Sequence, residues 1–123
     1  MAIVHLDPIT LKCMYDRDEI ILIDVRNAEE HQAIHIQRDM HIPLESVSKE
    51  TIPEFGDKRL AFYCRTGHAS RTACEIASEL YPGFNVFNLL AGIIGWSVHH
   101  FPVVLNGVNR TDPIPQPAEF DDD

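Results

Sequence analysis

The chain has 123 residues, of which 45% are hydrophobic and 24% are charged, and its net charge at pH 7 is −9. This length and composition predict one soluble globular domain with a single core. The acidic balance, without a run of basic residues, argues against nucleic acid or an anionic membrane as a partner. No stretch approaches the ~20 apolar residues of a membrane-spanning helix, and the N-terminal residues lack the pattern of a secretory signal.

The three cysteines are Cys13, Cys64 and Cys74. Their odd number and the lack of a Cys-x-x-Cys pair argue against a disulfide framework and against a sulfur-rich zinc site. We therefore expect a reducing compartment and a cytoplasmic protein. Cys13 falls in a predicted helix with no electropositive neighbour in sequence, so we expect it to pack against the core.

The first elements predicted are a strand over residues 3–6, a helix over 9–15 and a strand over 20–26. The last of these is apolar on both faces until its end, which is typical of a buried parallel strand. Asp24 and Arg26 lie at that end, where open α/β sheets place their ligand crevices. We expect these two residues to orient the site rather than to react.

Asn27 is the predicted cap of a helix that includes residues 28–31, and an ion pair between Arg26 and Glu30 is expected to steady that turn. Short extended pieces are expected at 35–36 and 40–43. An irregular or short helical segment is expected over 44–55, ended by Pro53 and Gly56.

Strands alternate with helical patterns in the second half as well, which predicts a parallel α/β sheet. The expected elements are a strand over 60–63, a helix over 69–80, a strand over 85–90 and a helix over 93–100 with Trp96 in the core. From residue 106 onward, three prolines alternate with polar residues, and the segment carries −4 of the −9 charges. We therefore expect a domain over 1–105 and an acidic, Pro-rich tail over 106–123.

Cys64 is the candidate nucleophile, because it lies where a buried strand ends and a helix begins. A loop entering a helix directs unpaired backbone N–H groups inward and lies at the positive end of the helix dipole. These groups lower the pKa of a thiol and could cradle a persulfide, a sulfur oxyanion or a phosphate. Gly67 gives the loop backbone freedom, and Arg65, His68 and Arg71 add positive or protonatable groups. The candidate anion-binding residues are Arg65, Thr66, Gly67, His68, Ala69, Ser70 and Arg71.

The alternative for Cys64 is a buried structural cysteine, since free cysteines are among the most buried residues. The order of strand, cysteine, glycine, basic residues and helix favours a reactive site instead. The chain also has seven histidines. They have no partner thiols in a ligand pattern, so no metal site is predicted.

Four segments, in order along the chain, resemble the rhodanese-like sulfurtransferases of the small single-domain kind. They are Ile23–Arg26 with Glu30-His31, His35-Ile36 with Ile42–Leu44, Cys64–Gly67 with Ser70, and Asn88-Leu89 with Gly92-Ile93, Trp96 and Pro102-Val103. The resemblance implies an α/β fold with a five-stranded, mainly parallel sheet flanked by helices on both faces. It implies transfer of a sulfane sulfur from thiosulfate or a persulfide donor to a thiophilic acceptor, a thiol or cyanide, through a persulfide on Cys64. No metal or organic cofactor is implied.

The chain departs from the family pattern at several positions. Members commonly carry glycines where Ile34 and Arg38 stand, and a Gly-Gly pair where this chain has Ala91-Gly92. Many have an arginine at the position of Ala69, so a second cation must come from Arg71 or be absent. The donor is therefore left open between a small sulfur-containing anion and a protein-borne persulfide.

Two other functions compete with sulfur transfer. A phosphatase or arsenate reductase would bind its oxyanion with the same backbone amides of the Cys64 loop. Related phosphatases, however, have an arginine where Ser70 stands, and no nearby aspartate is assigned as the acid that protonates the leaving group. A non-catalytic binding module would keep the fold as a docking surface, with Cys64 incidental, and the Pro-rich tail suits that role. The presence of Cys64 together with Gly67 and basic neighbours favours catalysis.

Overall fold

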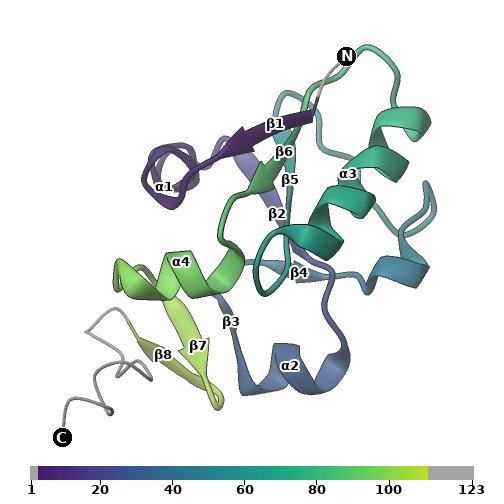
Figure 1. Cartoon of the computed structure of the whole chain (residues 1–123). Helices are drawn as coiled ribbons and strands as arrows, with labels where there is room; N and C mark the ends of the chain where they lie inside the picture. Colours follow the sequence, from purple (N-terminus) through teal and green to yellow (C-terminus); the bar gives the residue numbers. More distant parts are fainter. Residues whose placement is uncertain (1–2, 111–123) are drawn as a thin grey trace, which may run out of the picture.

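The computed structural model describes residues 3–110, and its centre is a sheet of five parallel strands in the order β1-β6-β5-β2-β4 (Figure 1). The strands are β1 (Ile3–Leu6), β2 (Ile20–Asp24), β4 (Met40–His41), β5 (Arg59–Tyr63) and β6 (Val86–Leu89). Of the three interior strands, β2 and β5 are largely apolar and almost entirely buried, as is typical of parallel strands covered on two faces. The predicted five-stranded sheet is confirmed.

A second, three-stranded antiparallel sheet was not expected from the sequence. It consists of β3 (Ile34–Ile36), β7 (Val103–Leu105) and β8 (Val108–Arg110), in that order. Asn106 and Gly107, both with positive φ, form the turn between β7 and β8. Residues 106–110, which the sequence analysis assigned to the tail, thus belong to a β-hairpin, and the rest of the predicted tail lies outside the described residues.

Among residues 3–110 the helices are α1 (Pro8–Asp16), α2 (Ala28–Ala33), α3 (His68–Leu80) and α4 (Gly92–Val98), together with the 3₁₀ turn η1 (Leu44–Ser46). Asp7 begins α1 by accepting a 2.7 Å hydrogen bond from the Thr10 amide, with Pro8 in the first turn. Asn27 begins α2 with a capping box that uses the Glu30 side chain. The expected Asn27 cap is therefore present, and η1 agrees with the irregular segment expected over 44–55.

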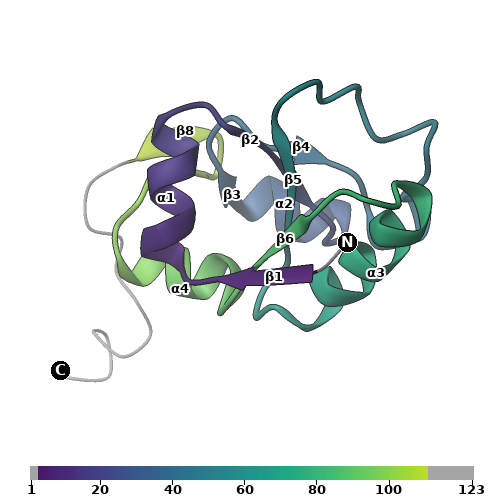
Figure 2. The same cartoon turned by 90° about the horizontal axis from the view of Figure 1, so that it is seen from above.

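Helices cover both faces of the sheet, as Figure 2 shows from above. On one face α1 and α4 bring Leu11 and Trp96 onto Leu22, and all three side chains are buried. On the other face α3 brings Ala73 and Ala77 onto Phe62. Burial of these two apolar layers is the main source of the stability of the fold.

Two expectations about single residues have different outcomes. Trp96 is fully buried, as expected, and its indole N–H donates to the Pro102 carbonyl oxygen at 2.9 Å. Cys13 is exposed on α1, so the expectation that it packs against the core is wrong. The reason is the helical period, which directs Leu11 and Tyr15 to the core and leaves Cys13 on the solvent side.

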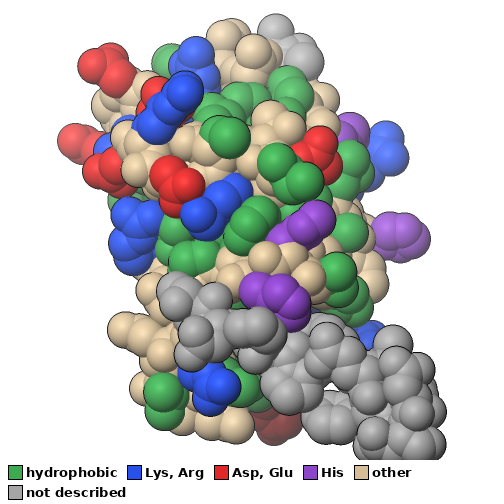
Figure 3. Space-filling view, turned by 90° about the vertical axis from the view of Figure 1, so that its left-hand side faces the viewer, with side chains coloured by type: hydrophobic (Ala, Val, Ile, Leu, Met, Phe, Trp, Pro, Cys, Tyr) green, Lys and Arg blue, Asp and Glu red, His purple; other side chains and the backbone are tan. Residues whose placement is uncertain are grey.

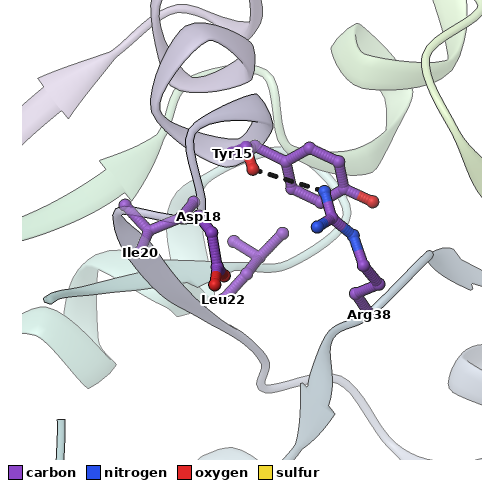
Figure 4. A pocket seen from close by; sticks show the side chains of 5 residues that line it. All are labelled: Tyr15, Asp18, Ile20, Leu22 and Arg38. Carbon is purple, nitrogen blue, oxygen red and sulfur yellow. Dashed lines mark hydrogen bonds between the residues drawn. The ribbon is translucent and has the colours of Figure 1, made fainter.

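Arg38 occupies a position where the resemblance described above implies glycine, and its φ of +66° lies in the region that favours glycine. Its guanidinium lies 4.0 Å from the centroid of the Tyr15 ring and donates to the Tyr15 carbonyl oxygen at 3.3 Å. The two side chains form the walls of a small pocket of about 50 Å³ with Asp18, Ile20 and Leu22 (Figure 4). This pocket contains no residue of the Cys64 loop.

On the side of the molecule where α1 and α4 lie, acidic, basic and hydrophobic side chains are interspersed (Figure 3). Within residues 3–110, none of the helices combines the length and the apolar character needed to span a bilayer.

Candidate active site

Cys64 follows β5 directly and lies beside the first turn of α3, as the sequence predicts. Its side chain is buried, with 4% of the residue exposed. The Gly67 amide donates to the Cys64 Sγ at 3.1 Å. Gly67 has a φ of +105°, which a residue with a Cβ rarely adopts, so the tight loop depends on glycine here.

Ser70 is the second group on the sulfur. Its hydroxyl oxygen is fully buried and lies 3.4 Å from Cys64 Sγ. Burial raises the pKa of the Cys64 thiol, but hydrogen bonds from the Ser70 side chain and from the amides of Ser70, Gly67 and Thr66 outweigh it, so the net pKa is lowered. The lowered pKa agrees with the expectation from the strand-to-helix position.

Helix α4 holds the backbone of the loop from the other side. The Ile93 amide donates to the Cys64 carbonyl oxygen at 3.0 Å, and the Ile94 amide donates to the Arg65 carbonyl oxygen at 3.4 Å. A Cβ on Gly92 would lie 2.4 Å from both carbonyl oxygens, so only glycine fits there. In Figure 1 the loop that enters α3 accordingly lies against the start of α4.

The other predicted anion-binding residues surround the loop. Arg65, Thr66, His68, Ala69 and Arg71 are exposed. They divide between two pockets. The α2-side pocket, of about 280 Å³, is lined by Arg26, Glu30, Ala33, Ile34, Arg65, Ile93, Ile94 and Ser97. The histidine-side pocket, of about 310 Å³, is lined by His5, Thr66, Gly67, His68, Arg71, Asn88 and Leu90.

The two pockets separate the predicted cations. Arg71 and His68 share the histidine-side pocket with the Gly67 backbone, whereas Arg65 lines the opposite pocket. Ala69, where the resemblance implies arginine, is among the lining residues of neither pocket. An anion in the histidine-side pocket would thus meet Arg71 one turn into α3.

Asp24 and Arg26 form a buried, bidentate ion pair at the end of β2. Arg26 Nη2 lies 2.9 Å from Asp24 Oδ2, and Arg26 Nε donates to Asp24 Oδ1 at 3.0 Å. The expected ion pair of Arg26 with Glu30 is replaced by this one, because the Glu30 carboxylate caps α2 instead. Arg26 also donates to the Ile34 carbonyl oxygen and thereby fixes β3 beside the α2-side pocket.

Three histidines stack beside this ion pair, a feature not predicted from the sequence. The rings of His35 and His41 lie parallel to that of His31, with centroids 3.9 and 4.4 Å away. His31 Nδ1 lies 2.8 Å from Asp24 Oδ2. Nearby, burial raises the pKa of Asp39 to about 7, although the Tyr63 hydroxyl donates to its carboxylate at 2.6 Å.

His31, His35 and Asp39 offer donor atoms within 4.8 Å of one another, as a metal site would require. Stacked parallel rings direct their lone pairs side by side rather than toward one point. In addition, His31 Nδ1 is engaged by Asp24 and His35 Nδ1 by the His31 carbonyl oxygen. We therefore assign these side chains to the polar network around the buried carboxylates Asp24 and Asp39.

Asn88 and His5 belong to the site although sequence reasoning did not select them as site residues. Asn88 is 2% exposed and accepts a hydrogen bond from the Ser70 hydroxyl. Its Nδ2 lies 3.1 Å from His5 Nδ1 on β1. The available signal was a polar residue within the otherwise apolar strand Val86–Leu89, close to its carboxyl end.

Comparisons with known proteins agree with this geometry. A sulfurtransferase of Allochromatium vinosum is 31% identical over 91 residues, which cover 72% of this chain and 82% of that protein. A tRNA uridine(34) hydroxylase of Cytophaga hutchinsonii is 34% identical over 102 residues, covering 76% of this chain but 31% of that protein.

Among solved structures, a rhodanese-related protein of Thermoplasma volcanium superposes with a TM-score of 0.71 and 28% identity, covering 83% of this chain and 98% of that one. The family model of the Rhodanese-like domain matches residues 7–99, which include β2, the Cys64 loop and α4. On this match, the chain belongs to the Rhodanese-like domain family.

Proposed function

We propose that the protein is a sulfurtransferase that moves a sulfane sulfur through a persulfide on Cys64. The observation that carries the proposal is the buried Cys64 sulfur, which accepts hydrogen bonds from backbone amides and whose pKa is lowered. A thiolate is the nucleophilic form of cysteine, so a lowered pKa makes the attacking species available near neutral pH. The sulfurtransferase of Allochromatium vinosum, similar over most of its length, supports the same activity.

With thiosulfate as donor, the Cys64 thiolate attacks the outer sulfur. The new bond joins Cys64 Sγ to that sulfur, while the sulfur–sulfur bond of thiosulfate breaks and its electron pair leaves with sulfite. The negative charge of the thiolate moves to the outer sulfur of the persulfide. Amides of the loop and the start of α3 are suited to hold that charge. His68 and Arg71, which line the histidine-side pocket, are the groups proposed to receive the donor anion.

The second half of the reaction returns the enzyme to its starting state. An acceptor thiolate or cyanide attacks the outer sulfur of the persulfide, and the bond between the two sulfurs of the persulfide breaks. Its electron pair returns to Cys64 as a thiolate. Protons are not required in either step if donor and acceptor react as anions, so no general acid is invoked.

A phosphatase or arsenate reductase is a weaker candidate. The position that holds a cation in related phosphatases is Ser70, whose neutral hydroxyl is buried between Cys64 and Asn88. Arg71, the next residue, is exposed and lines a pocket instead. A phosphoryl group in the cradle would therefore lack a cation at that position.

The test is to measure thiocyanate formation from thiosulfate and cyanide alongside hydrolysis of an aryl phosphate by the same preparation. Sulfur transfer with no phosphate release is the expected result. Aryl phosphate hydrolysis that depends on Cys64 would instead identify a phosphatase. If neither reaction occurs, with thiosulfate or with a protein persulfide as donor, the binding-module alternative would replace catalysis.

A further inference from the structure

The hydroxyl of Ser70 has one hydrogen, and two neighbouring atoms can accept it. Asn88 Oδ1 is one acceptor, and Cys64 Sγ, 3.4 Å from the hydroxyl oxygen, is the other. All three side chains are buried, so water does not supply a substitute donor as it would at the surface. The position of this hydrogen therefore affects the charge state of the sulfur.

The orientation of the Asn88 amide is fixed by its other contacts. Its Nδ2 donates to the Gly67 carbonyl oxygen at 3.2 Å and faces His5 Nδ1 at 3.1 Å. A carbonyl oxygen only accepts, so the NH₂ group must lie on this side and Oδ1 must face Ser70. His5 Nδ1 is accordingly an acceptor, with the ring hydrogen on Nε2. Asn88 is thus held as a permanent acceptor for the Ser70 hydroxyl.

The direction in which the hydroxyl hydrogen of Ser70 points depends on the chemical state of Cys64. A thiol donates its own hydrogen to Ser70, which is then free to donate to Asn88. A thiolate has its charge on Sγ and draws the Ser70 hydrogen to itself, leaving Asn88 Oδ1 unpaired. A persulfide has its charge on the outer sulfur, so the neutral Sγ releases the hydroxyl to Asn88 again.

We propose that Asn88 is a positioning residue that competes with Cys64 for the Ser70 hydrogen and thereby stabilises the thiol and the persulfide relative to the thiolate. The statement about the persulfide rests on the proposed function, whereas the statement about the thiol does not. The proposed effect of Asn88 on the charge state of Cys64 depends on Ser70. The dependence on Ser70 distinguishes this role from a purely structural one, in which Asn88 would only hold Gly67 in place through its hydrogen bond to the Gly67 carbonyl oxygen.

The experiment measures the rate at which iodoacetamide alkylates Cys64, at a pH where the thiol is still mostly protonated. Asn88→Leu has a similar size but no acceptor, so the thiolate keeps the Ser70 hydrogen and the rate should rise about two- to tenfold, the effect of one hydrogen bond. In a Ser70→Ala background the same substitution should change the rate less than about twofold. Ser78→Ala, which removes another buried hydroxyl of α3, is the matched control and should leave the rate unchanged.

Asn88→Leu also removes the contacts of Asn88 with Gly67 and His5, and the Ser70→Ala background controls for this loss. The charged and titratable side chains that line the two pockets are His5, His68 and Arg71 on one side and Arg26, Glu30 and Arg65 on the other. Asn88→Ala repeats the test with a smaller side chain if Asn88→Leu does not fold. No rise in rate in a folded variant, a fall in rate, or an equal rise in the Ser70→Ala background would each overturn the proposal.

A second arm uses the persulfide form. Once loaded with sulfur, Asn88→Leu should release it to cyanide about two- to tenfold faster than the parent, because its persulfide is less stabilised. An equal or slower release would contradict the competition. Failure of both proteins to load from thiosulfate or a protein persulfide would tell against the proposed function, while the alkylation result would still decide the role of Asn88.

Discussion

Cys64 and Cys74 are both buried, yet their thiols are shifted in opposite directions. Cys74 lies in the middle of α3, where burial raises its pKa to about 12, with smaller contributions from the charges of Glu75 and Cys64. Its sulfur donates a hydrogen bond to the Phe87 carbonyl oxygen at 3.4 Å. Cys64 is buried too, but amides and a hydroxyl surround its sulfur and lower its pKa. The direction of the pKa shift is therefore decided by the donors that face each sulfur rather than by burial.

The largest expected difference between the two cysteines is in sulfur transfer. Cys64→Ser should reduce the rate by more than about 1000-fold, because a hydroxyl cannot form the persulfide. Cys74→Ser should retain activity within about twofold, because the Cys74 sulfur donates to a carbonyl oxygen instead of accepting from amides. The measurement is thiocyanate formation, with circular dichroism to verify folding. Equal loss in both folded variants would require a dithiol relay instead of a single nucleophile.

The next effect comes from the support that α4 gives the loop. Gly92→Ala places a methyl group against the Cys64 and Arg65 carbonyl oxygens, so we expect a loss of about 1–3 kcal/mol in the free energy of unfolding and about 10-fold or more in kcat/KM. Gly56→Ala is the matched control, because φ is +55° there and +54° at Gly92 but no atom lies within 4 Å of the added methyl group. Urea denaturation and steady-state kinetics measure both. If the two variants behaved alike, backbone strain rather than steric contact would account for the glycine at position 92.

A smaller effect is expected at the rim of the histidine-side pocket. Arg71→Ala should raise the KM for thiosulfate and lower kcat/KM about tenfold, the effect of one charge-assisted hydrogen bond. A protein-borne or uncharged donor should be affected much less, because it does not need that cation. Arg65→Ala, on the other side of the loop, serves as the comparison. An equal loss with every donor would mean that Arg71 maintains the loop instead of binding the anion.

The smallest effect is alkaline instability caused by Cys74. Its folded pKa lies above that of an unfolded thiol, so its thiol contributes fully to stability below pH ~8.5, and stability is lost as the unfolded chain ionises above that value. Between pH 8.5 and 9.5 the parent should lose about 1 kcal/mol more free energy of unfolding than Cys74→Ala does. Urea denaturation at the two pH values is the measurement. Parallel pH dependence in both proteins would show that Cys74 ionises as readily in the fold as outside it.

The sequence predicted those parts of the fold that depend on local patterns. The apolar run Ile20–Asp24 and the change from strand to helix around Cys64 have a periodicity that one segment reveals by itself. The backbone freedom expected of Gly67 agrees with its φ of +105°. These features located the candidate nucleophile and the amides that face it.

Features that depend on distant segments were not predictable in this way. Asn88 meets Ser70 across 18 residues of sequence and His5 across 83, and β3 pairs with β7 rather than with a neighbouring strand. Cys74 shows the same limit, because its sequence neighbours do not reveal that Phe87 covers its sulfur. A single sequence reports which face of an element is apolar but not which side chain it meets.

The most direct test of the central claim is the intact mass of the protein after incubation with thiosulfate and removal of excess donor, followed by peptide mapping. The account predicts a gain of one sulfur atom on Cys64, none on Cys74, and loss of the added mass on treatment with cyanide. A stable added sulfur on Cys74 or Cys13, with Cys64 unmodified in folded protein, would contradict it.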